Sequence, residues 1–320
     1  MKVLITGGFG YVGGRLAQHL ASLGDHGIVL GTRREMPVPG WCPQAQVVRM
    51  QWESEESLSA ACGGVDAVVH LAGMNAQECS ADPVKALAVN GVATARLVRA
   101  AVVRGVRRFI HVSTAHVYGS PLSGTISEDS CALAVHPYAT SHRAGEDAVL
   151  LANTDGKLEG IVVRLSNSFG PPVHADVDCW MLLVNDLCRQ AVTEGRIQLQ
   201  SAGLQRRDFI TLTDACRGVA LLLQMPSGTP RFGVFNLGGE WAPSVLEMAQ
   251  RVVERCGGVL GCSPELLRPA PAAGAQALAL DYRIDRLRAA GFVPENAIDA
   301  EITATLAFCV ASRGQLQSTS

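Results

Sequence analysis

Apolar positions in the first half of the chain fall into short runs that alternate with amphipathic stretches. Residues 2–6 form the first run, and apolar residues then recur at Leu16, Leu20 and Leu23. A short apolar run is typical of a buried strand, whereas a repeat every three to four residues is typical of one helix face. The same pattern predicts strands at 27–32, 46–50, 65–71, 107–112, 159–165 and 233–237, and helices near 54–62, 83–104, 138–152 and 213–224. This alternation predicts an α/β fold with a Rossmann-type, doubly wound parallel sheet.

The alternation ends near residue 166, which indicates a change of architecture. Later helices are predicted near 179–192, 244–256, 283–290 and 299–312, and 268–281 is rich in Ala and Pro and reads as a loop or flap. We therefore expect a first domain at 1–165, to which segments near 207–240 return. A smaller C-terminal α/β substrate lobe is expected from 166–206 and 241–313, followed by a frayed tail at 314–320.

A glycine-rich turn joins the first strand to the first helix. Residues 7–13 read GGFGYVG, and this strand, glycine turn and helix form the context of a dinucleotide-binding fingerprint. Gly7 permits the tight turn, Gly10 lets the backbone approach a pyrophosphate, and Gly13 lets the helix pack against the strand. The helix N-terminus would face the phosphates. The expected cofactor contacts here are Gly7, Gly10, Tyr11, Val12 and Gly13.

Two arginines follow the second strand, where an enzyme that uses NAD commonly has an acidic residue to hold the ribose. The segment 31–34 reads GTRR. Guanidinium groups match a 2′-phosphate, so Arg33 and Arg34 favour NADP, with NAD as the alternative. The other interpretation of these arginines is a solvated, charged loop.

Composition excludes several classes of protein. Apolar residues make up 48% of the chain, charged residues 18%, and the net charge is −2. These values describe a folded protein without a basic surface for nucleic acid or anionic membrane. The apolar runs are strand-sized, so no signal peptide or membrane span is expected. The ten cysteines are scattered without ligand spacing, which predicts reduced thiols, a cytoplasmic setting and no metal site.

A tyrosine and a histidine stand four residues apart at Tyr138 and His142, shortly after VSTAHVYG at 112–119. On a helix this spacing places both side chains on one face, one turn apart. The tyrosine is a candidate proton donor or acceptor. Only three of the 27 basic residues in the chain are lysines, and none of them occupies this helix.

The ordered motifs resemble those of the extended short-chain dehydrogenase/reductase family, the nucleotide-sugar epimerases, dehydratases and reductases. The resemblance covers nearly the whole chain through TGGFGYVG at 6–13, HLAG at 70–73, VSTAHVYG at 112–119, PYATSH at 137–142, RLSNSFGPP at 164–172, RRDFITLTD at 206–214 and FNLGG at 235–239. It implies a nucleotide-diphosphate sugar bound between the Rossmann domain and the lobe. It also implies a homodimer that pairs the helices near 85–104 and 138–152.

The resemblance implies roles for Tyr138 and for the residues near it. Thr114 matches the Ser/Thr that hydrogen-bonds the reacting oxygen, and Tyr138 matches the acid/base that exchanges a proton with a sugar hydroxyl or carbonyl. His142 departs from the family, where a lysine at this position holds the nicotinamide ribose and places a positive charge beside the tyrosine. A cation lowers the pKa of a neighbouring tyrosine, whereas an unperturbed imidazole titrates near 6.5. Further cofactor contacts implied by the resemblance are Leu71, Ala72, Gly73 and Asn90.

Three interpretations of His142 remain open: catalysis through a modified relay, a slow enzyme that mainly reduces a ketone, and a binding protein without turnover. Arg143 is not expected to substitute, because it projects about 100° around the helix from His142.

Residues near Thr114 and in the second half of the chain narrow the choice among the possible reactions. Sugar 4,6-dehydratases of the family typically carry an Asp-Glu pair directly after the Thr114 position, and here those positions are Ala115 and His116. Dehydration is therefore disfavoured, while His116 either faces the sugar or packs beneath the cleft. The resemblance also implies substrate contacts at Asn167, Arg207 and Arg268, with Arg207 gripping the diphosphate.

We therefore expect a cytoplasmic, NADP-preferring enzyme that transfers hydride at a ring carbon of a nucleotide sugar, with C4 epimerisation as the first choice. A 4-ketosugar reductase or sugar dehydrogenase is the alternative within the family. A regulatory protein that binds cofactor and sugar nucleotide without turnover is the alternative from another class. A reductase of non-nucleotide substrates is a third, and Arg207 argues against it.

Overall fold

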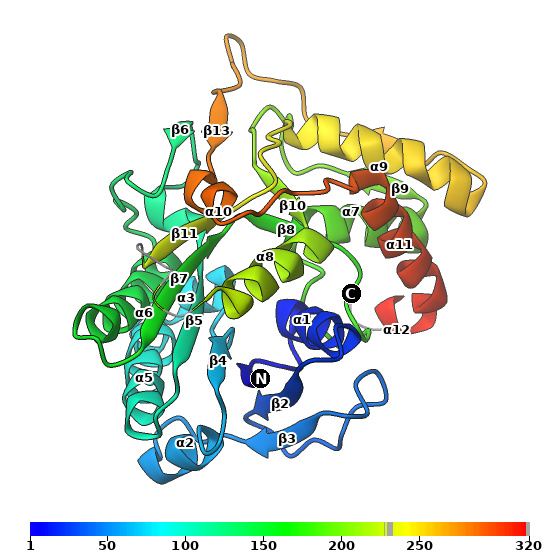
Figure 1. Ribbon diagram of the computed structural model, residues 1–320. Coiled ribbons are helices and arrows are strands. Elements are labelled where there is room, and N and C mark those ends of the chain that lie inside the picture. The colour runs from blue at the N-terminus through cyan, green and yellow to red at the C-terminus, as the bar shows by residue number, and fades with distance from the viewer. Residues whose placement is uncertain (227, 229–232, 318–320) are drawn as a thin grey trace.

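The computed structural model describes residues 1–226, 228 and 233–317, and a seven-stranded parallel sheet forms its centre (Figure 1). In spatial order the strands are β3 (Gln46–Arg49), β2 (Gly27–Thr32), β1 (Lys2–Thr6), β4 (Ala67–His70), β5 (Arg108–Thr114), β7 (Glu159–Leu165) and β11 (Val234–Leu237). These are the seven predicted strands, so the predicted fold class is confirmed. The strand order reverses beside β1, which pairs with β2 on one side and β4 on the other. A crevice at such a switch point is where open parallel sheets bind ligands.

Side chains of alternate strand residues pack against helices on opposite faces of the sheet. Val3 and Ile5 pack on the side of α1 (Tyr11–Ser22) and α8 (Leu212–Gln224). Leu4 packs on the opposite side, in the core cluster that also contains residues of three further helices. These helices are α2 (Glu55–Ala61), α5 (Ala93–Val103) and α6 (Pro137–Thr154). Both faces of the sheet are therefore buried, as the continuous apolar runs predict.

The predicted helix at 83–104 is a composite. It consists of α4 (Pro83–Ala86), the π-helical turn η1 (Leu87–Val92) and α5, and α3 (Ala76–Ala81) precedes it. The run Pro83–Val103 is long and apolar enough to cross a membrane by length and composition alone, and half of its most apolar window is buried. A core helix of a folded domain meets the same criterion. Here η1 packs against α6, and α5 packs against α2.

A second core lies in the C-terminal lobe, at the upper right of Figure 1. Its helices are α7 (Leu183–Glu194), α9 (Val245–Leu260) and α11 (Ile298–Ala311), and a capping box of Ser244 and Glu247 opens α9. Short parallel pairs border it: β8 (Asn167–Phe169) with β10 (Phe209–Thr211), and β9 (Arg196–Gln198) with β12 (Glu265–Leu267).

Two expectations about the second half need correction. The end of the expected loop at 268–281 belongs to a strand, β13 (Leu280–Tyr282), which pairs with β6 (Gly124–Ile126) and is followed by α10 (Asp285–Ala289). The expected frayed tail is helical over α12 (Arg313–Gln317), because Leu316 is buried in the second core. Residues 318–320 lie outside the described residues.

The cofactor-side helix α1 is tied to the C-terminal lobe by hydrogen bonds. The Tyr11 hydroxyl donates to the Gly170 carbonyl at 2.9 Å. The Arg15 guanidinium donates to Pro171 O at 3.0 Å and contacts Glu301 of α11 at 3.4 Å. These contacts hold the two cores together at the N-terminal half of α1.

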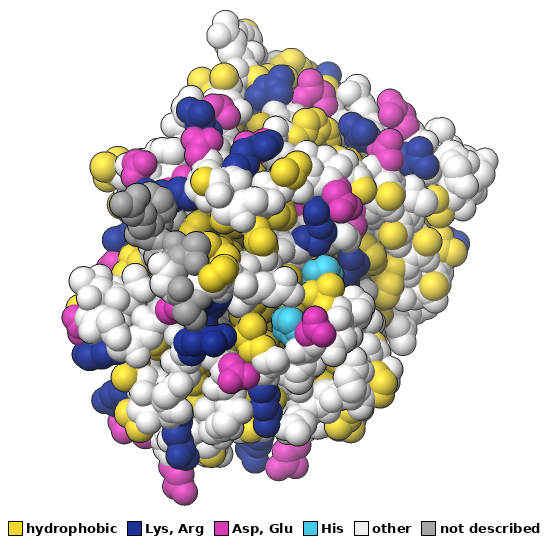
Figure 2. Space-filling view, in the orientation of Figure 1, with side chains coloured by type: hydrophobic (Ala, Val, Ile, Leu, Met, Phe, Trp, Pro, Cys, Tyr) yellow, Lys and Arg dark blue, Asp and Glu magenta, His cyan; other side chains and the backbone are white. Residues whose placement is uncertain are grey.

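Charges of both signs are interspersed on the face shown in Figure 2, without a large patch of one sign. All ten cysteines are free thiols, and eight of them are buried.

Candidate functional site

A cavity of about 530 Å³ opens at the carboxyl ends of β1, β4, β5 and β7, where the glycine-rich turn lies. Gly7 has a φ of +67°, a left-handed conformation that favours glycine. A Cβ at Gly13 would lie 2.2 Å from Gly7 O, so only glycine allows this approach of helix to turn. Gly10 is the N-cap of α1 without a side-chain cap, which leaves amide donors of the first turn free. This cradle fits the pyrophosphate of a dinucleotide.

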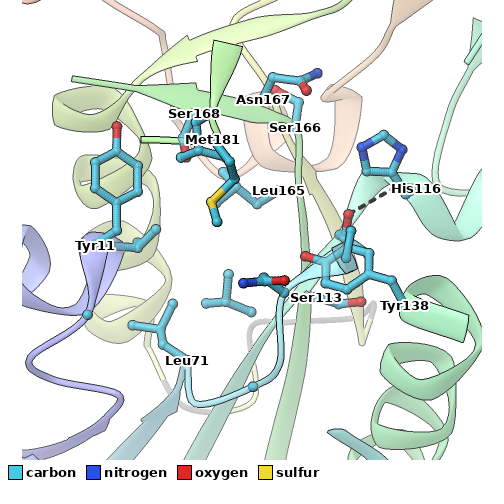
Figure 3. A pocket seen from close by; sticks show the side chains of 18 of the residues that line it. Tyr11, Leu71, Ser113, His116, Tyr138, Leu165, Ser166, Asn167, Ser168 and Met181 are labelled. Carbon is cyan, nitrogen blue, oxygen red and sulfur yellow. Dashed lines mark hydrogen bonds between the residues drawn. The ribbon is translucent and has the colours of Figure 1, made fainter. Parts of the chain in front are cut away.

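The predicted acid/base residues meet on one side of the cavity (Figure 3). Thr114 ends β5, and Tyr138 lies in the first turn of α6, which begins with Pro137 after the N-cap His136. Both side chains line the cavity, and Tyr11 lies on the opposite side. The ring of His116 also lines it, with its centroid 6.5 Å from that of Tyr138. The His116 amide donates to Thr114 Oγ1 at 3.1 Å, so His116 follows directly from the strand end that places Thr114.

His142 lies one turn after Tyr138, as predicted, and the two rings meet edge to face with centroids 4.6 Å apart. His142 lines the cavity, although only 8% of it is exposed. Its Nδ1 is buried without a hydrogen-bond partner, so Nε2 is the ring nitrogen available to a ligand. A Cβ at Gly73 would lie 3.6 Å from His142 Cε1. The loop after β4 therefore passes directly over this ring.

Two further histidines continue from His142 into the core. The His111 ring stacks on His142 with centroids 5.9 Å apart, and His70 stacks on His111 at 5.4 Å. Both ring nitrogens of His111 are buried without partners, whereas His70 hydrogen-bonds Thr6 and Thr94. We call His70, His111 and His142 the histidine column.

Burial keeps the site uncharged around Tyr138. It lowers the pKa of His142 to about 3, with a further lowering by His111 and a partial offset from Glu146. It also raises the pKa of Tyr138 above its usual value, and the Thr114 side chain offsets part of that rise. His142 is therefore neutral at physiological pH and cannot acidify the phenol as a cation would.

A buried ion pair between Glu146 and Arg164 holds together the elements that carry Tyr138 and Thr114. Glu146 is fully buried and accepts hydrogen bonds from Ser113 Oγ at 2.6 Å and from the Arg164 guanidinium at 3.1 and 2.7 Å. Glu146 stands one turn after His142 on α6. The bidentate pair with Arg164 ties α6 to β7, and the bond with Ser113 ties α6 to β5. It thereby fixes the two elements that carry Tyr138 and Thr114.

Asn90 acts on the cavity through the loop after β4. It is buried in η1, accepts a hydrogen bond from Met74 N at 2.8 Å and donates to Ser141 Oγ at 3.0 Å. Leu71 and Gly73 of this loop line the cavity, whereas Ala72 and Asn90 do not. Asn90 therefore shapes the loop that was expected to contact the cofactor, without facing the cavity itself.

The side of the cavity that faces away from the glycine-rich turn includes residues of the lobe. Arg207 is the one charged residue among the described residues that line it, and it donates to Gln205 Oε1 at 3.2 Å. Burial lowers the pKa of Arg207, but a guanidinium stays protonated at physiological pH. Asn167 lines the same wall and donates to Asp208 O at 2.9 Å. The predicted positions of both residues in the cleft agree with the structure.

Three predicted arginines do not reach this cavity. Arg33 and Arg34 are exposed beyond the end of β2, away from the residues that line it. Arg268 follows β12, is exposed and donates to Ala202 O at 2.8 Å. β12 pairs with β9, and the segment 268–279 that follows it is exposed.

Sequence reasoning did not identify Glu146, Arg164 and His111 as parts of this region. Glu146 falls four residues after His142, so the helical repeat that linked Tyr138 to His142 reaches it as well. Arg164 and His111 lie within apolar strands, where a polar residue is a signal of a buried partner. The lining residues 74–77 and 181–184 lie in segments that gave no such signal.

The chain matches the family model described as the NAD dependent epimerase/dehydratase family over residues 3–238. A dTDP-glucose 4,6-dehydratase of an Actinoplanes species is 29% identical over 277 residues, which covers 80% of this chain and 82% of the relative.

Solved structures share the fold. DesIV, a dTDP-glucose 4,6-dehydratase from Streptomyces venezuelae solved with NAD bound, superposes with a TM-score of 0.83 and 23% identity, covering all of both chains. A UDP-glucose 4-epimerase from Thermus thermophilus, in complex with NAD, gives 0.79 at 22% identity and covers 96% of this chain and 99% of that one.

The family-model match covers the glycine cradle, Thr114, Tyr138 and Arg207 as one continuous unit. Together with the parallel sheet and its cavity, it shows that the chain belongs to the NAD dependent epimerase/dehydratase family, as its resemblance to the extended short-chain dehydrogenases/reductases implied.

Proposed function

We propose that the protein is a nicotinamide-dependent oxidoreductase that transfers hydride at a ring carbon of a nucleotide-diphosphate sugar. The observation that carries this proposal is the meeting of Tyr138 and Thr114 in one cavity with the glycine cradle. The cradle, with Leu71, Gly73 and His142, would hold the dinucleotide. When bound, this group supplies a ring that accepts or donates hydride. The Thr114 and Tyr138 hydroxyls would hold the reacting oxygen, and Tyr138 can donate a hydrogen bond to a carbonyl.

The substrate class follows from the charge of the cavity. A single cation, Arg207, matches an anionic diphosphate, because a guanidinium fork forms strong hydrogen bonds with phosphate oxygens. Asn167 supplies a neutral wall for the sugar or its phosphates. Structural neighbours have been solved with UDP-glucose, UDP-glucuronic acid and dTDP-type ligands in the same fold, which supports a nucleotide sugar.

The state of Tyr138 favours one direction of the reaction. Burial and the absence of a cation beside it among the described residues keep the phenol protonated. A protonated phenol can donate a hydrogen bond to a ketone oxygen, whereas it cannot itself accept the proton that an alcohol loses on oxidation. The cavity therefore best supports reduction of a ketosugar at C4. Epimerisation at C4 is the second candidate, because structural neighbours include 4-epimerases.

The test is a panel of UDP- and dTDP-4-ketosugars with NADPH and NADH. We expect the wild type to oxidise the reduced nucleotide with at least one substrate. Tyr138→Phe should lower kcat by about 10²-fold or more and leave cofactor affinity unchanged. Thr140→Val, at an exposed position on the same helix, is the matched control. If the wild type converts no substrate while it still binds cofactor and nucleotide, the protein is the non-catalytic binding protein.

We also propose a preference for NADP. Arg33 and Arg34 are exposed at the carboxyl end of β2 and make no ion pair among the described residues, so both guanidiniums are available to a 2′-phosphate. Replacing both with Ala should weaken NADPH binding roughly tenfold or more, since hydrogen bonds to charged groups contribute about 1.5–3 kcal/mol. NADH affinity should not change. Arg49→Ala, whose guanidinium already bonds Glu35, is the control, and equal NAD and NADP affinities unaffected by the double substitution would contradict the preference.

A homodimer in the cytoplasm completes the proposal. Apolar side chains are exposed along the composite helix and α6, among them Val84 at 79%, Val103 at 73% and Leu151 at 63%. A second copy of these helices would cover them. The ten free thiols fit a reducing compartment.

A further inference from the structure

Oxidation of a sugar alcohol in this cavity needs a group that accepts the hydroxyl proton, and the described lining residues offer few. None of them is a carboxylate, and the titratable residues are Tyr11, His116, Tyr138, His142 and Arg207. The Tyr11 hydroxyl already donates to Gly170 O across the lobe contact. Arg207 has no lone pair to accept a proton. Three candidates remain: Tyr138, His142 and His116.

Tyr138 and His142 are poor acceptors for structural reasons. A phenol accepts a proton only as phenolate, and among the residues that the structure describes no cation acts on Tyr138 to stabilise that anion. His142 would have to become an imidazolium whose Nδ1–H is buried without an acceptor and whose ring is stacked on the neutral His111. Creating such an unsatisfied buried donor is costly.

We propose that His116 accepts the hydroxyl proton in alcohol oxidation and returns it in ketone reduction, while Tyr138 and Thr114 hold the reacting oxygen. This inference rests on the proposed function. Its geometric basis is that His116 lines the cavity beside Tyr138 and is joined through its own amide to Thr114 Oγ1. His116 Nδ1 is buried without a partner, so Nε2 is the nitrogen available to substrate. An oxygen bound between Thr114 and Tyr138 would therefore lie on the side of the cavity that His116 occupies, where a general base could act directly or through one water.

The step balances without another reactant. The carbinol carbon loses its hydrogen with the bonding electron pair to the nicotinamide ring, and the C–O bond becomes a carbonyl. The hydroxyl proton moves to His116 Nε2, which leaves a ketosugar and an imidazolium. In the reverse direction the imidazolium returns that proton to the oxygen as the carbon accepts hydride.

The substrate itself would make the imidazolium possible. Burial, Arg207 and His136 all lower the pKa of His116, and a backbone interaction with Gly119 raises it in part. Tyr138 is the other titratable group that faces it. A diphosphate bound at Arg207 would neutralise that positive charge and raise the pKa of His116. His116 would therefore be neutral in the free protein, and its protonation would become easier once the nucleotide is in place.

The first experiment follows the histidines by NMR with and without UDP, in the absence of cofactor and of turnover. We expect one resonance, missing in His116→Gln, to titrate at higher pH when UDP is added, and Arg207→Gln to remove that response. A His116 resonance that titrates at the same pH with and without UDP would overturn the coupling to the diphosphate.

The second experiment measures oxidation of UDP-glucose and dTDP-glucose, or of the alcohol made from whichever ketosugar the panel shows to be reduced, between about pH 5.5 and 10. If a histidine accepts the proton, the rate should increase as the pH is raised through the acidic range and should be constant above about pH 7. His116→Gln should lower kcat by about 10²-fold or more and leave an activity that climbs toward alkaline pH. His19→Gln, at the far end of α1, should match the wild type.

The outcomes separate the two proposals. A wild-type rate that climbs continuously to pH 10, or a His116→Gln profile equal to the wild type, assigns the proton to Tyr138 and overturns the role of His116 alone. A wild type that neither oxidises nor reduces any sugar nucleotide overturns the proposed function.

Discussion

Tyr138 has a neutral neighbour, His142, one helical turn further along α6. The His142 ring meets the phenol edge to face at 4.6 Å, and burial lowers the pKa of that imidazole to about 3. None of the three lysines, at Lys2, Lys85 and Lys157, lines the cavity beside Tyr138. Arg143 points outward, 40% exposed, to Glu146 and Asp147. The phenol therefore depends on its hydrogen-bond partners rather than on a fixed charge.

His142→Lys should lower the pKa of Tyr138 by about one unit or more, because a cation one helical turn away stabilises phenolate. The measurement is the ultraviolet titration of tyrosinate, taken as the difference between each protein and its Tyr138→Phe counterpart. Thr140→Lys adds the same charge on an exposed part of α6 and should leave the titration unchanged. If the two lysine variants titrate alike, the charge at position 142 does not control Tyr138.

The sequence identified this pair because helical spacing alone brings Tyr138 and His142 to one face. It could not identify the state of His142, since that depends on His111 and Gly73, which approach it only in the folded sheet and loop. Whether His116 faces the cavity or packs beneath it was equally undecided. The turn that follows β5 decides it by placing the ring beside Tyr138.

The histidine column joins three elements, because β4 carries His70, β5 carries His111 and α6 carries His142. His70 and His111 are register partners on adjacent strands, so their rings stack on the same face of the sheet. Gly145 on α6 admits this arrangement, since a Cβ there would lie 3.1 Å from His111 Nε2. The helix thus packs closely on the neutral imidazole of His111.

Acidification should destabilise this packing. Burial lowers the pKa of His111 to about 4, whereas in the unfolded chain it titrates near 6.5. The unfolded state therefore binds more protons below about pH 6.5, and stability falls as pH drops from there toward the folded pKa. Each such histidine costs about 2 kcal/mol between pH 6.5 and 5.

The measurement is urea unfolding of the wild type and His111→Phe at several pH values. The comparison is needed because Asp208 acts in the opposite sense, burial having raised the pKa of its carboxyl to about 7. From pH 7 to 5 the free energy of unfolding of the variant should improve by about 2 kcal/mol relative to the wild type. A difference between the two proteins that does not vary with pH would contradict a neutral buried His111.

At the scale of the whole molecule, the exposed apolar positions on the composite helix and α6 should lie in a subunit interface. Val84→Glu combined with Leu151→Glu should convert a dimer to a monomer, because it places charges on a surface that a second copy would bury. Light scattering after size-exclusion chromatography measures the mass. Leu133→Glu, at an exposed apolar position outside these helices, is the control. A wild type that elutes as a monomer at micromolar concentration would contradict the proposed homodimer.

The main sheet was predictable because each of its strands contains a short apolar run, as in 3–5 and 161–163. The three-residue strands of the lobe were not, since β8, β9, β10 and β12 are too short for a period to show. The helical tail was missed for a related reason. Leu316 is a single apolar residue in a polar segment, and only the second core shows that it is buried.

The hydrogen bonds from Tyr11 and Arg15 to the lobe also affect whether the lobe can be exchanged for that of another protein in a chimera. The same twelve-residue helix that presents its N-terminus to the cradle contacts Gly170, Pro171 and Glu301 of the lobe. The domain that carries the parallel sheet and the C-terminal lobe are therefore not interchangeable parts joined by a linker. A chimera that takes its lobe from a relative would have to import partners for both side chains, or its two halves would lose their common alignment over the cavity.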